Sequence, residues 1–463
     1  MAVLSVPRPA AARPKRVPLP RVWPVGVPDI VWLLALNGLV IAAMWVRHGG
    51  LADLGAAGAV LTAVGQLTGL AAAYFALLQL VLMSRSPWLD QVFGMDGLAW
   101  AHRWLGFLTI WLVLAHGAFT IAGYAMGDGS PILAEAWTIL TTYAWVWPAT
   151  VGFAAFVVIG ITSVRAARRR LSYESWFLVH LLAYAAIALG FAHEVLVGSD
   201  FMHDPLARAY WIGLYAIAIG LVAAFRIGAP IRLNVRHRLR VAHVVREGPG
   251  LASIYVTGRD LDRLAVRSGQ YFVWRFIAGS SWWHGHPFSL SSAPNGDWLR
   301  ITVKALGDDT RALQRLPIGT RVLVEGPYGV LTGARRRRRK VLLIAGGIGI
   351  APLRALVESL PAKAGEMILL YRAREPKHVV FRDELETLTE VRGIDVRYLV
   401  GRRGSIDLPV DPLAGPSLRR AVPDISERDV YLCGPVAMMD RVEATLRDLG
   451  LPRRQIHAER FAY

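Results

Sequence analysis

Four histidines inside apolar segments are the residues of this sequence best placed to do chemistry. His102 and His116 lie in one segment, and His180 and His193 lie in another. The first two are 14 residues apart, which is about 21 Å along a helix and within about 40° on its surface. The second two are 13 residues apart, and an ideal helix separates them by about 140°. A π-bulge or bend near Gly190 would bring that pair onto one face.

Imidazole side chains ligate zinc, copper and haem iron. No carboxylate joins the four histidines at matching depth. Glu194 is adjacent to His193, but its side chain points about 100° away around the helix. The single cysteine, Cys433, excludes an intrachain disulfide and a Cys₄ zinc or iron–sulfur site within one chain. These donors fit two haem b groups, each with two axial histidines, stacked across a membrane. The alternative is that the four rings only pack or hold water.

Six long apolar segments in the first half of the chain would position these histidines. Hydrophobic residues make up 54% of the sequence and charged residues 19%, whereas soluble domains have roughly 25% charged residues. A membrane-spanning helix needs about 20 mostly apolar residues. We expect six such helices, the third with an interfacial turn, over 29–46, 60–83, 98–126, 143–164, 173–196 and 208–226.

The cations cluster in alternate loops between these segments. The sequence holds 52 Lys and Arg against 34 Asp and Glu, a net charge of +18. The positive-inside rule predicts a multi-pass plasma-membrane protein with both termini in the cytoplasm. We therefore expect contact with membrane lipid and no binding to nucleic acid. Residues 1–28 lack a signal-peptide cleavage site and are expected to form a disordered cytoplasmic arm. The basic clusters include Arg13, Lys15, Arg16, Arg85, Arg168, Arg169, Arg170, Arg226 and Arg232.

The next part of the chain, 229–334, has the alternating pattern of short strands. Turn residues separate the strands, so we expect a small antiparallel β-barrel. Within it, His286-Pro287-Phe288-Ser289 follows a strand. Lys304 comes directly after another expected strand, and Thr310 is expected to begin a short helix whose N-terminus binds phosphate. Gly326-Pro327-Tyr328-Gly329 closes the unit. The expected strands are 231–235, 253–257, 271–276, 299–303 and 321–325.

Residues 338–463 change to alternating strands and helices. The apolar run 341–345 is typical of a buried parallel strand, and the glycine turn Gly346-Gly347-Ile348-Gly349-Ile350-Ala351-Pro352 follows it. This order predicts a doubly wound α/β domain with a ligand at the carboxyl ends of the strands. The spacing is not the GxGxxG fingerprint. The basic run Arg335–Arg339 before this domain is either a solvated linker or a site for anionic lipid.

These motifs together resemble a known family. The second half, with His286-Pro287-Phe288-Ser289, the glycine turn and Cys433-Gly434-Pro435, is similar to the ferredoxin–NADP reductase superfamily. With the six histidine-bearing segments, the chain resembles the ferric reductase and NADPH oxidase family of transmembrane flavocytochromes b. The resemblance implies a multi-domain membrane protein: a six-helix haem-binding bundle (29–228), a β-barrel FAD domain (229–334) and an α/β nicotinamide domain (338–463).

The resemblance also implies roles for single residues, and it implies that the 13-residue spacing of His180 and His193 is compatible with haem. His286, Pro287, Phe288 and Ser289 would contact the flavin. Lys304 and Thr310 would lie near the FAD diphosphate. Either Phe461 or Tyr463 would stack on the flavin. The residues implied for the nicotinamide cofactor are Gly346, Gly347, Gly349 and Pro352 for its pyrophosphate, and Cys433 and Gly434 for its ring.

The preferred nicotinamide cofactor is suggested by two arginines. Arg372 and Arg374 follow the strand that ends at Tyr371, where an NADH-preferring site places an acidic residue. Guanidinium groups match the 2′-phosphate of NADPH, so we expect NADPH rather than NADH. The alternative is that both arginines are solvated surface charges.

The expected activity is transmembrane electron transfer. Electrons would pass from cytoplasmic NADPH through FAD and two haems b to a small-molecule acceptor at the outer face. This acceptor is a ferric chelate or dioxygen, and the latter would give superoxide. Thr120 stands where oxygen-reducing members often carry another histidine, so this choice stays open. The alternative function is a haem-containing redox sensor or an electron-donor subunit that reduces a partner protein.

Overall fold

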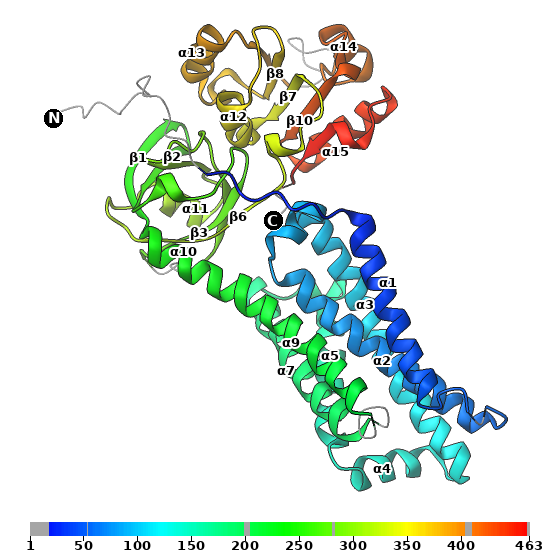
Figure 1. The fold of residues 1–463 in the computed structure, drawn as a ribbon. Coiled ribbons are helices and arrows are strands. Elements are labelled where there is room, and N and C mark those ends of the chain that lie inside the picture. The colour runs from blue at the N-terminus through cyan, green and yellow to red at the C-terminus, as the bar shows by residue number, and fades with distance from the viewer. Residues whose placement is uncertain (1–17, 53, 199–203, 280–282, 403–409, 461–463) are drawn as a thin grey trace. The chain divides into compact units, whose positions relative to one another are not determined.

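The computed structural model describes residues 18–52, 54–198, 204–279, 283–402 and 410–460. The chain forms two compact units, shown in Figure 1. The helical unit comprises residues 24–93 and 97–227, and the sheet unit consists mainly of residues 228–463. Most of the predicted arm 1–28 lies outside the described residues, as do Phe461 and Tyr463.

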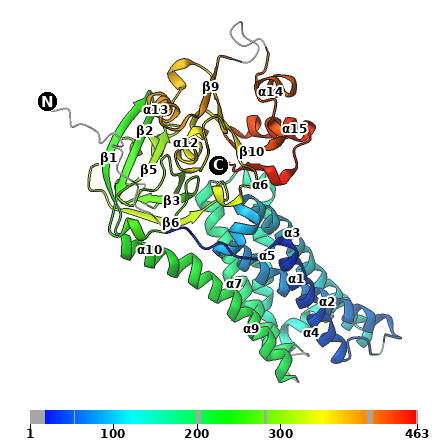
Figure 2. The same cartoon turned by 45° about the horizontal axis from the view of Figure 1, so that its top comes forward.

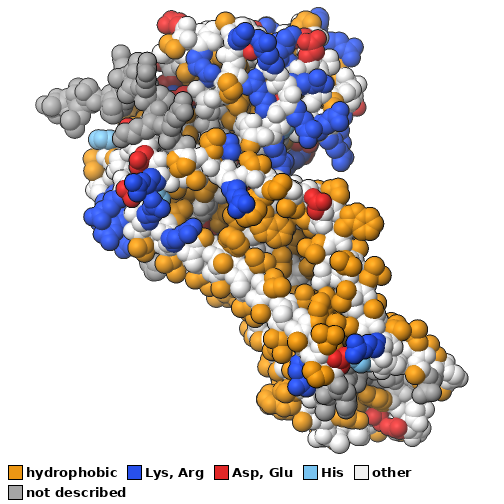
Figure 3. Space-filling model, in the orientation of Figure 1, with side chains coloured by type: hydrophobic (Ala, Val, Ile, Leu, Met, Phe, Trp, Pro, Cys, Tyr) orange, Lys and Arg blue, Asp and Glu red, His pale blue; other side chains and the backbone are white. Residues whose placement is uncertain are grey.

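The helical unit contains six helices that are long and apolar enough to cross a membrane, which confirms the six predicted segments. Large apolar side chains cover its outer surface (Figure 3), as expected of helices that face lipid. Trp32, for example, is 75% exposed. The helices are α1 (Val27–Arg47), α2 (Ala57–Met83), α3 (Pro87–Asp128), α4 (Ile132–Thr142), α5 (Val146–Ser163), α6 (Arg165–Arg168), α7 (Tyr173–Val197) and α9 (Pro205–Leu221), followed by the π-helix η1 (Val222–Gly228).

The third segment is interrupted near its start. Gly94 has φ 67° and ψ 160°, which breaks the helical path of α3. Backbone with positive φ favours glycine because it has no Cβ. The break lies seven residues after α3 begins at Pro87 and four residues before the predicted segment 98–126, which is itself helical throughout, so the interfacial turn expected within that segment lies outside it.

The predicted strand 231–235 is wrong, because these residues belong to helix α10 (Ala229–His237). Ile231-Arg232-Leu233-Asn234-Val235 alternates like a strand. However, the Asn234 amide makes two bonds to the backbone of Val324, donating to its carbonyl at 2.8 Å and accepting from its N–H at 2.9 Å. Asn234 also donates to Pro230 O within the helix at 2.8 Å. A contact with a distant strand thus overrides the local pattern.

The next six strands build two three-stranded antiparallel sheets with orders β1-β2-β5 and β4-β3-β6. The sheets are joined by isolated bridges at Arg240–Arg321 and Leu290–Ile301, in place of the continuous ladder of a closed barrel. Trp274 and Ile254 are fully buried in the shared core. The elements are β1 (Arg240–Gly248), β2 (Leu251–Thr257), β3 (Tyr271–Phe276), β4 (His286–Ser289), β5 (Leu299–Lys304), α11 (Asp308–Leu313) and β6 (Val322–Tyr328). Short 3₁₀ turns lie at η2 (Leu261–Arg263) and η3 (Gly333–Arg335).

The remainder forms a parallel five-stranded sheet of order β11-β10-β7-β8-β9. Alternate residues of β7 enter two separate cores: Leu343 packs with α12 and α13, and Leu342 packs with α14 and α15. Helices therefore cover both faces (Figure 2), which confirms the predicted doubly wound organisation. The elements are β7 (Lys340–Gly346), α12 (Ile350–Ser359), β8 (Met367–Ala373), α13 (Arg382–Arg392), β9 (Asp395–Val400), α14 (Gly415–Ala421), β10 (Arg428–Cys433), α15 (Val436–Asp448) and β11 (Ile456–Ala458). Single 3₁₀ turns are η4 (Gly347–Gly349), η5 (Pro376–His378), η6 (Ile425–Glu427) and η7 (Arg453–Gln455).

The basic run Arg335–Arg339 is anchored to this sheet. The backbone N–H groups of Arg337 and Arg338 donate to the buried carboxylate of Asp429 at 2.5 and 2.7 Å. Arg339 forms an ion pair with Glu366 at 2.5 Å. The backbone of the run is therefore held by the sheet, whereas Arg337, Arg338 and Arg339 are exposed, and both the linker and the lipid interpretations stay predictions.

Candidate functional site

His102 and His180 face each other between α3 and α7. Their ring centroids lie 5.9 Å apart, with an interplanar angle of 63°. The Nδ1 atoms of both rings are buried and make no hydrogen bond to any described residue. The Trp176 ring lies 4.9 Å from that of His180 and covers it on one side. The pairing predicted for the first depth is thus present, and it leaves imidazole nitrogens available to a ligand.

His116 and His193 form the second pair on the same two helices, and they interact electrostatically. His116 Nδ1 lies 2.8 Å from Gly65 O of α2, so the ring N–H donates to this carbonyl. A Cβ at Gly69 would lie 2.7 Å from the same nitrogen, which leaves no room for a side chain there. Helix α7 is α-helical over Tyr173–Val197, so the structure has no π-bulge at Gly190.

The two pairs fit a haem better than a metal ion held by protein alone. Imidazole nitrogens bind metals at about 2 Å, which places the centroids of two rings on one ion roughly 6 Å apart, close to the 5.9 Å observed. A structural zinc site needs four protein ligands, but no group of three or more His, Cys, Asp or Glu within the described ranges could hold a metal. Two imidazoles complete the coordination of an iron whose other ligands come from a macrocycle.

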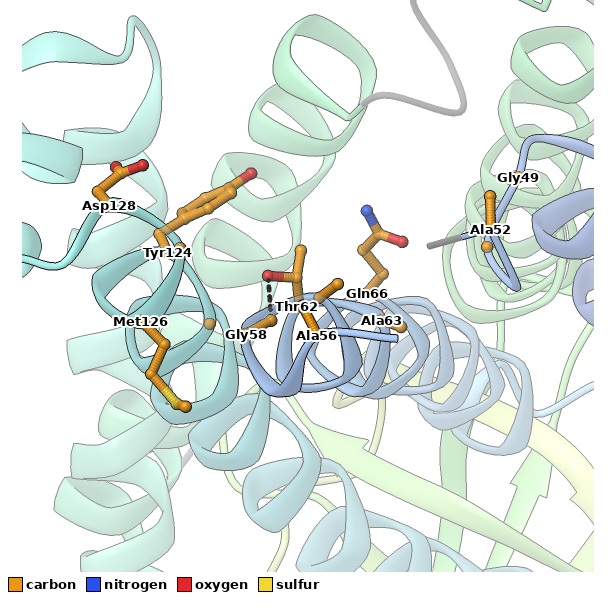
Figure 4. A pocket seen from close by; sticks show the side chains of 14 residues that line it. Gly49, Ala52, Ala56, Gly58, Thr62, Ala63, Gln66, Tyr124, Met126 and Asp128 are labelled. Carbon is orange, nitrogen blue, oxygen red and sulfur yellow. Dashed lines mark hydrogen bonds between the residues drawn. The ribbon is translucent and has the colours of Figure 1, made fainter. Parts of the chain in front are cut away.

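A pocket of about 510 Å³ lies at one end of α2 and α3, next to the loop after α1 (Figure 4). Thr62 and Gln66 contribute polar groups to it, and Gln66 Oε1 accepts a hydrogen bond from Trp45 at 3.0 Å. Gln66 adjoins Gly65, the acceptor for His116, so the pocket lies at the His116 end of the unit. Its lining comprises Gly49, Gly50, Ala52, Ala56, Gly58, Ala59, Thr62, Ala63, Gln66, Gly123, Tyr124, Met126, Gly127 and Asp128.

The predicted flavin segment is strand β4, which pairs with β3. The rings of His286 and Phe288 stack with centroids 5.9 Å apart, and Trp274 Nε1 donates to Phe288 O at 3.0 Å. Burial, together with the nearby His284 and Arg275, lowers the pKa of His286. Ser289 Oγ is buried and makes no hydrogen bond to any described residue. This segment is thus held rigidly and offers one unsatisfied hydroxyl.

The two residues predicted near the diphosphate lie at the end of β5 and in α11. Lys304 is exposed at the last position of β5. Helix α11 begins at Asp308, two residues before the predicted start at Thr310. Thr310 Oγ1 accepts from the N–H groups of Leu306 and Gly307 at 2.8 and 3.0 Å. Its hydroxyl therefore caps its own helix, and the phosphate role stays a prediction.

The glycine turn lies at the carboxyl edge of the parallel sheet, where β7 and β10 pair side by side. A Cβ at Gly349 would overlap the Cys433 carbonyl, and one at Gly434 would lie 2.7 Å from Met438 Cε and 3.1 Å from Gly346 Cα. Gly347 has φ +54° and open space around its Cα. Close packing of two strand ends thus requires Gly349 and Gly434, while Gly347 leaves the backbone open to a ligand.

Glu459 lies beside the Cys433 thiol, a pairing that the sequence analysis missed. Burial, with a smaller contribution from the Glu459 carboxylate, raises the pKa of Cys433, so the thiol is neutral at physiological pH. Glu459 also approaches Gly329, where a Cβ would lie 2.5 Å from its Oε1. Glu459 therefore lies next to residues of two separate motifs, Gly329 and Cys433. In the sequence, the only signal of this role was that Glu459 comes shortly before the aromatic residues Phe461 and Tyr463.

The two arginines predicted to follow a strand differ in their surroundings, because β8 extends to Ala373, so Arg372 lies inside the strand and Arg374 follows it. Arg372 donates to the carbonyls of Leu399 and Ala373 at 2.8 and 2.5 Å, which ties it to the strand ends. Arg374 is exposed, and no described residue forms a hydrogen bond or an ion pair with it. Of the two, Arg374 has the guanidinium that is available to a phosphate.

A buried ion network, also missed by the sequence analysis, joins β5 to α12 and α13. Arg300 is 2% exposed and bonds to both Glu384 oxygens, at 2.7 and 2.9 Å. Arg354 also pairs with Glu384, at 2.7 Å, and with Glu358. Burial alone would raise the pKa of Glu384, but the two guanidinium groups outweigh it and hold the pKa low. No local sequence pattern marks this network, because its members lie up to 84 positions apart.

Three family models match the chain: a ferric reductase like transmembrane component over residues 68–191, an FAD-binding domain over 251–332 and an oxidoreductase NAD-binding domain over 343–444. Ferredoxin–NADP reductase B of Sorangium cellulosum is 32% identical over 38% of this chain and 77% of its own length.

The ferredoxin reductase component of 3-ketosteroid-9-alpha-monooxygenase from Rhodococcus rhodochrous is 30% identical over 48% of this chain, which spans 64% of that relative's length. A crystal structure of a ferredoxin NADP+ reductase from Neisseria gonorrhoeae with bound FAD and NADP aligns with 48% of this chain and 97% of its own, at 19% identity and a TM-score of 0.42.

Proposed function

Because the chain belongs to the ferredoxin–NADP reductase family through its second half and carries a ferric reductase-like transmembrane component in its first, we propose that it passes electrons from NADPH across a membrane. It is an NAD(P)H-dependent oxidoreductase and a multi-pass membrane protein. The route would run through FAD and two bis-histidine haems b to an acceptor at the outer face. The observation that carries the proposal is the pairing of α3 and α7 histidines, of which His102, His116 and His180 lie inside the ferric reductase-like region and His193 lies two residues beyond it.

When bound, FAD accepts a two-electron hydride and releases single electrons, which bis-histidine haem can relay without binding gas. His102 and His180 would hold the inner haem, and His116 and His193 the outer one. Gly65 O fixes the orientation of the His116 ring by accepting its Nδ1 hydrogen. Such an acceptor also raises the basicity of a ligating imidazole.

In the sheet unit, β4 with His286, Pro287, Phe288 and Ser289 would bind the flavin, and Gly347 would admit the nicotinamide cofactor's pyrophosphate. The neutral Cys433 thiol adds no charge beside the nicotinamide. Within the proposed domains, 229–334 and 338–463, the bonds of Arg300 to Glu384 hold β5 against α13. They thus fix the spacing between the flavin and nicotinamide domains.

The outer acceptor would enter at the pocket between α2 and α3, which lies at the His116 end of the unit. Under the positive-inside rule this end faces outward, because the cationic loops follow α2, α5 and η1 at the opposite helix ends. A ferric chelate and dioxygen are both compatible with this pocket. The second candidate function, an electron-donor subunit, predicts slow turnover with any soluble acceptor until a partner protein is added.

A liposome assay tests the proposal. Purified protein is reconstituted with ferric citrate trapped inside the vesicles and NADPH added outside. We expect NADPH oxidation that depends on the trapped iron. His116→Ala should abolish this transfer while FAD remains bound and an external artificial dye is still reduced, because only the outer haem loses a ligand. Equal rates with empty and iron-filled vesicles, or an unaffected His116→Ala variant, would refute transfer across the membrane.

A further inference from the structure

Gln79 has a buried amide near the C-terminal end of the membrane helix α2, four residues before the helix ends at Met83. Its Oε1 and Nε2 atoms are both buried, and neither makes a hydrogen bond to any described residue. In a bilayer no water compensates an unpaired polar group, so such a side chain is costly unless a partner satisfies it. Apolar side chains surround it in α2, among them Leu78 and Leu80. The position of Gln79 therefore indicates a specific partner.

The packing of α2 against α3 identifies which residue Gln79 faces. The two helices run antiparallel and touch through small residues: a Cβ at Gly58 would lie 3.1 Å from the nitrogen of Gly127, and one at Gly65 would lie 2.6 Å from Thr120 Oγ1. Seven residues forward along α2 thus correspond to seven residues back along α3. This register is constant over the two turns that join these contacts.

Gln79 lies 14 residues after Gly65 on α2. In the same register, Gln79 therefore faces α3 in the way that Gly65 does at the other end of the helix pair. Gly65 contacts Thr120 and accepts the Nδ1 hydrogen of His116. Moving both helices by 14 residues replaces Gly65 by Gln79, Thr120 by Gly106 and His116 by His102. The first of these replaced contacts is present, since a Cβ at Gly106 would lie 3.3 Å from Gln79 Nε2.

The remaining contact in this comparison is the one between Gln79 and His102, which corresponds to the hydrogen bond between Gly65 and His116. Both of its members lack a hydrogen-bond partner in the described part of the chain. His102 Nδ1 is buried without a hydrogen bond to any described residue, as is Gln79 Oε1. A ligating histidine almost always donates its other ring N–H to a carbonyl, a carboxylate or water. His116 has the backbone carbonyl of Gly65 for this purpose. An amide carbonyl on the opposite helix would serve His102 in the same way.

We propose that Gln79 is the positioning residue of the inner haem site, where its Oε1 accepts the Nδ1 hydrogen of His102. Rotation of the amide exchanges its oxygen and nitrogen without moving the rest of the side chain. The bond fixes the tautomer that leaves His102 Nε2 to the iron and makes the imidazole more basic. This inference rests on the proposed function, because it assumes that His102 ligates a haem.

The test is a potentiometric titration of the two haems in the full-length protein. Gln79→Met keeps the length of the side chain and removes the strong acceptor, while Gln79→Glu retains an oxygen at the same reach. Asn37→Leu is the matched control, because Asn37 is an amide in the membrane helix α1 that accepts a hydrogen bond from Tyr210 and bonds to no described histidine. Haem content per chain is measured for each variant in parallel.

In Gln79→Met we expect one midpoint potential to rise by about 59 mV, which corresponds to a tenfold change in the relative affinity for the two oxidation states. The other potential should stay constant, and Gln79→Glu should restore the wild-type value or lower it. Two haems with unchanged potentials in Gln79→Met would overturn the inference, as would the same shift in Asn37→Leu.

If Gln79→Met loses one haem, Gln79→Glu must retain both, and loss from both variants would overturn the inference. A wild-type protein without haem would overturn the proposed function and the inference together. A wild-type protein with two haems that Gln79 does not influence would overturn the inference alone.

Discussion

At the scale of single residues, Arg374 decides the expected choice of nicotinamide cofactor. Arg372 is committed to two backbone carbonyls, whereas the exposed Arg374 can form charge-assisted bonds to a 2′-phosphate. Loss of such a contact costs about 1.5–3 kcal/mol. Arg374→Ala should therefore raise KM for NADPH about ten- to hundredfold and leave KM for NADH nearly unchanged in steady-state assays.

The control for this prediction is Arg419→Ala, which removes an exposed cation from α14 without touching the strand ends. It should leave both KM values close to those of the wild type. A wild-type preference for NADH, or equal effects of Arg374→Ala on both cofactors, would contradict the role of Arg374.

The histidine pairs could be predicted from residue type and spacing, because an ionisable side chain inside an apolar segment is conspicuous. Gln79 could not, since a single neutral amide has no period and its meaning comes from the register between α2 and α3. Arg372 shows the opposite failure: the sequence placed it after a strand, but it lies within β8, and its carbonyl partners belong to the fold.

At the scale of elements, the Arg300–Glu384–Arg354 network connects β5 to α12 and α13. Glu384→Gln would leave two buried guanidinium groups without their shared counter-charge, which costs roughly 3–5 kcal/mol. We expect the variant to release FAD at a markedly lower temperature, followed by flavin fluorescence. Glu386→Gln on the same helix is the control, because its pair with Arg382 is exposed and contributes about 0–1 kcal/mol.

The same carboxylate makes the sheet unit sensitive to acid. The pKa of Glu384 in the folded state lies below its usual value of 4.5, so the ionised form stabilises the fold above about pH 4.5. This contribution is lost as the pH falls through the lowered pKa. The FAD-release temperature of the wild type should therefore fall more steeply below pH 4.5 than that of Glu384→Gln. Parallel profiles would show that the network does not contribute.

The sequence correctly predicted those elements whose pattern of apolar residues follows directly from how the element itself is buried. The buried parallel strand β7 and the six apolar helices belong to this class. Helix α10 does not belong to this class. Ile231–Val235 alternates like a strand, but the hydrogen bonds between Asn234 and Val324, which the local sequence does not reveal, accompany a helix there. Strand β1 was missed because its burial is mixed, with only Val241 fully buried among its nine residues.

At the scale of the whole molecule, one chain combines a membrane unit with two buried histidine pairs and a flavin–nicotinamide unit of reductase type. Composition and the position of the cations suffice to predict this division. The identity of the acceptor cannot be predicted in the same way, because the pocket at the His116 end of the unit is lined mainly by small residues, with Tyr124 and Asp128 beside them.

The most direct measurement is an anaerobic titration of the purified full-length protein with NADPH, followed by absorbance spectroscopy with haem and flavin quantified per chain. We predict one FAD and two low-spin haems b, with the flavin bleached and both haems reduced by NADPH, then reoxidised on addition of ferric citrate or oxygen. A protein that contains no haem, or haems that NADPH leaves oxidised while the flavin is reduced, would contradict electron transfer through the two histidine pairs.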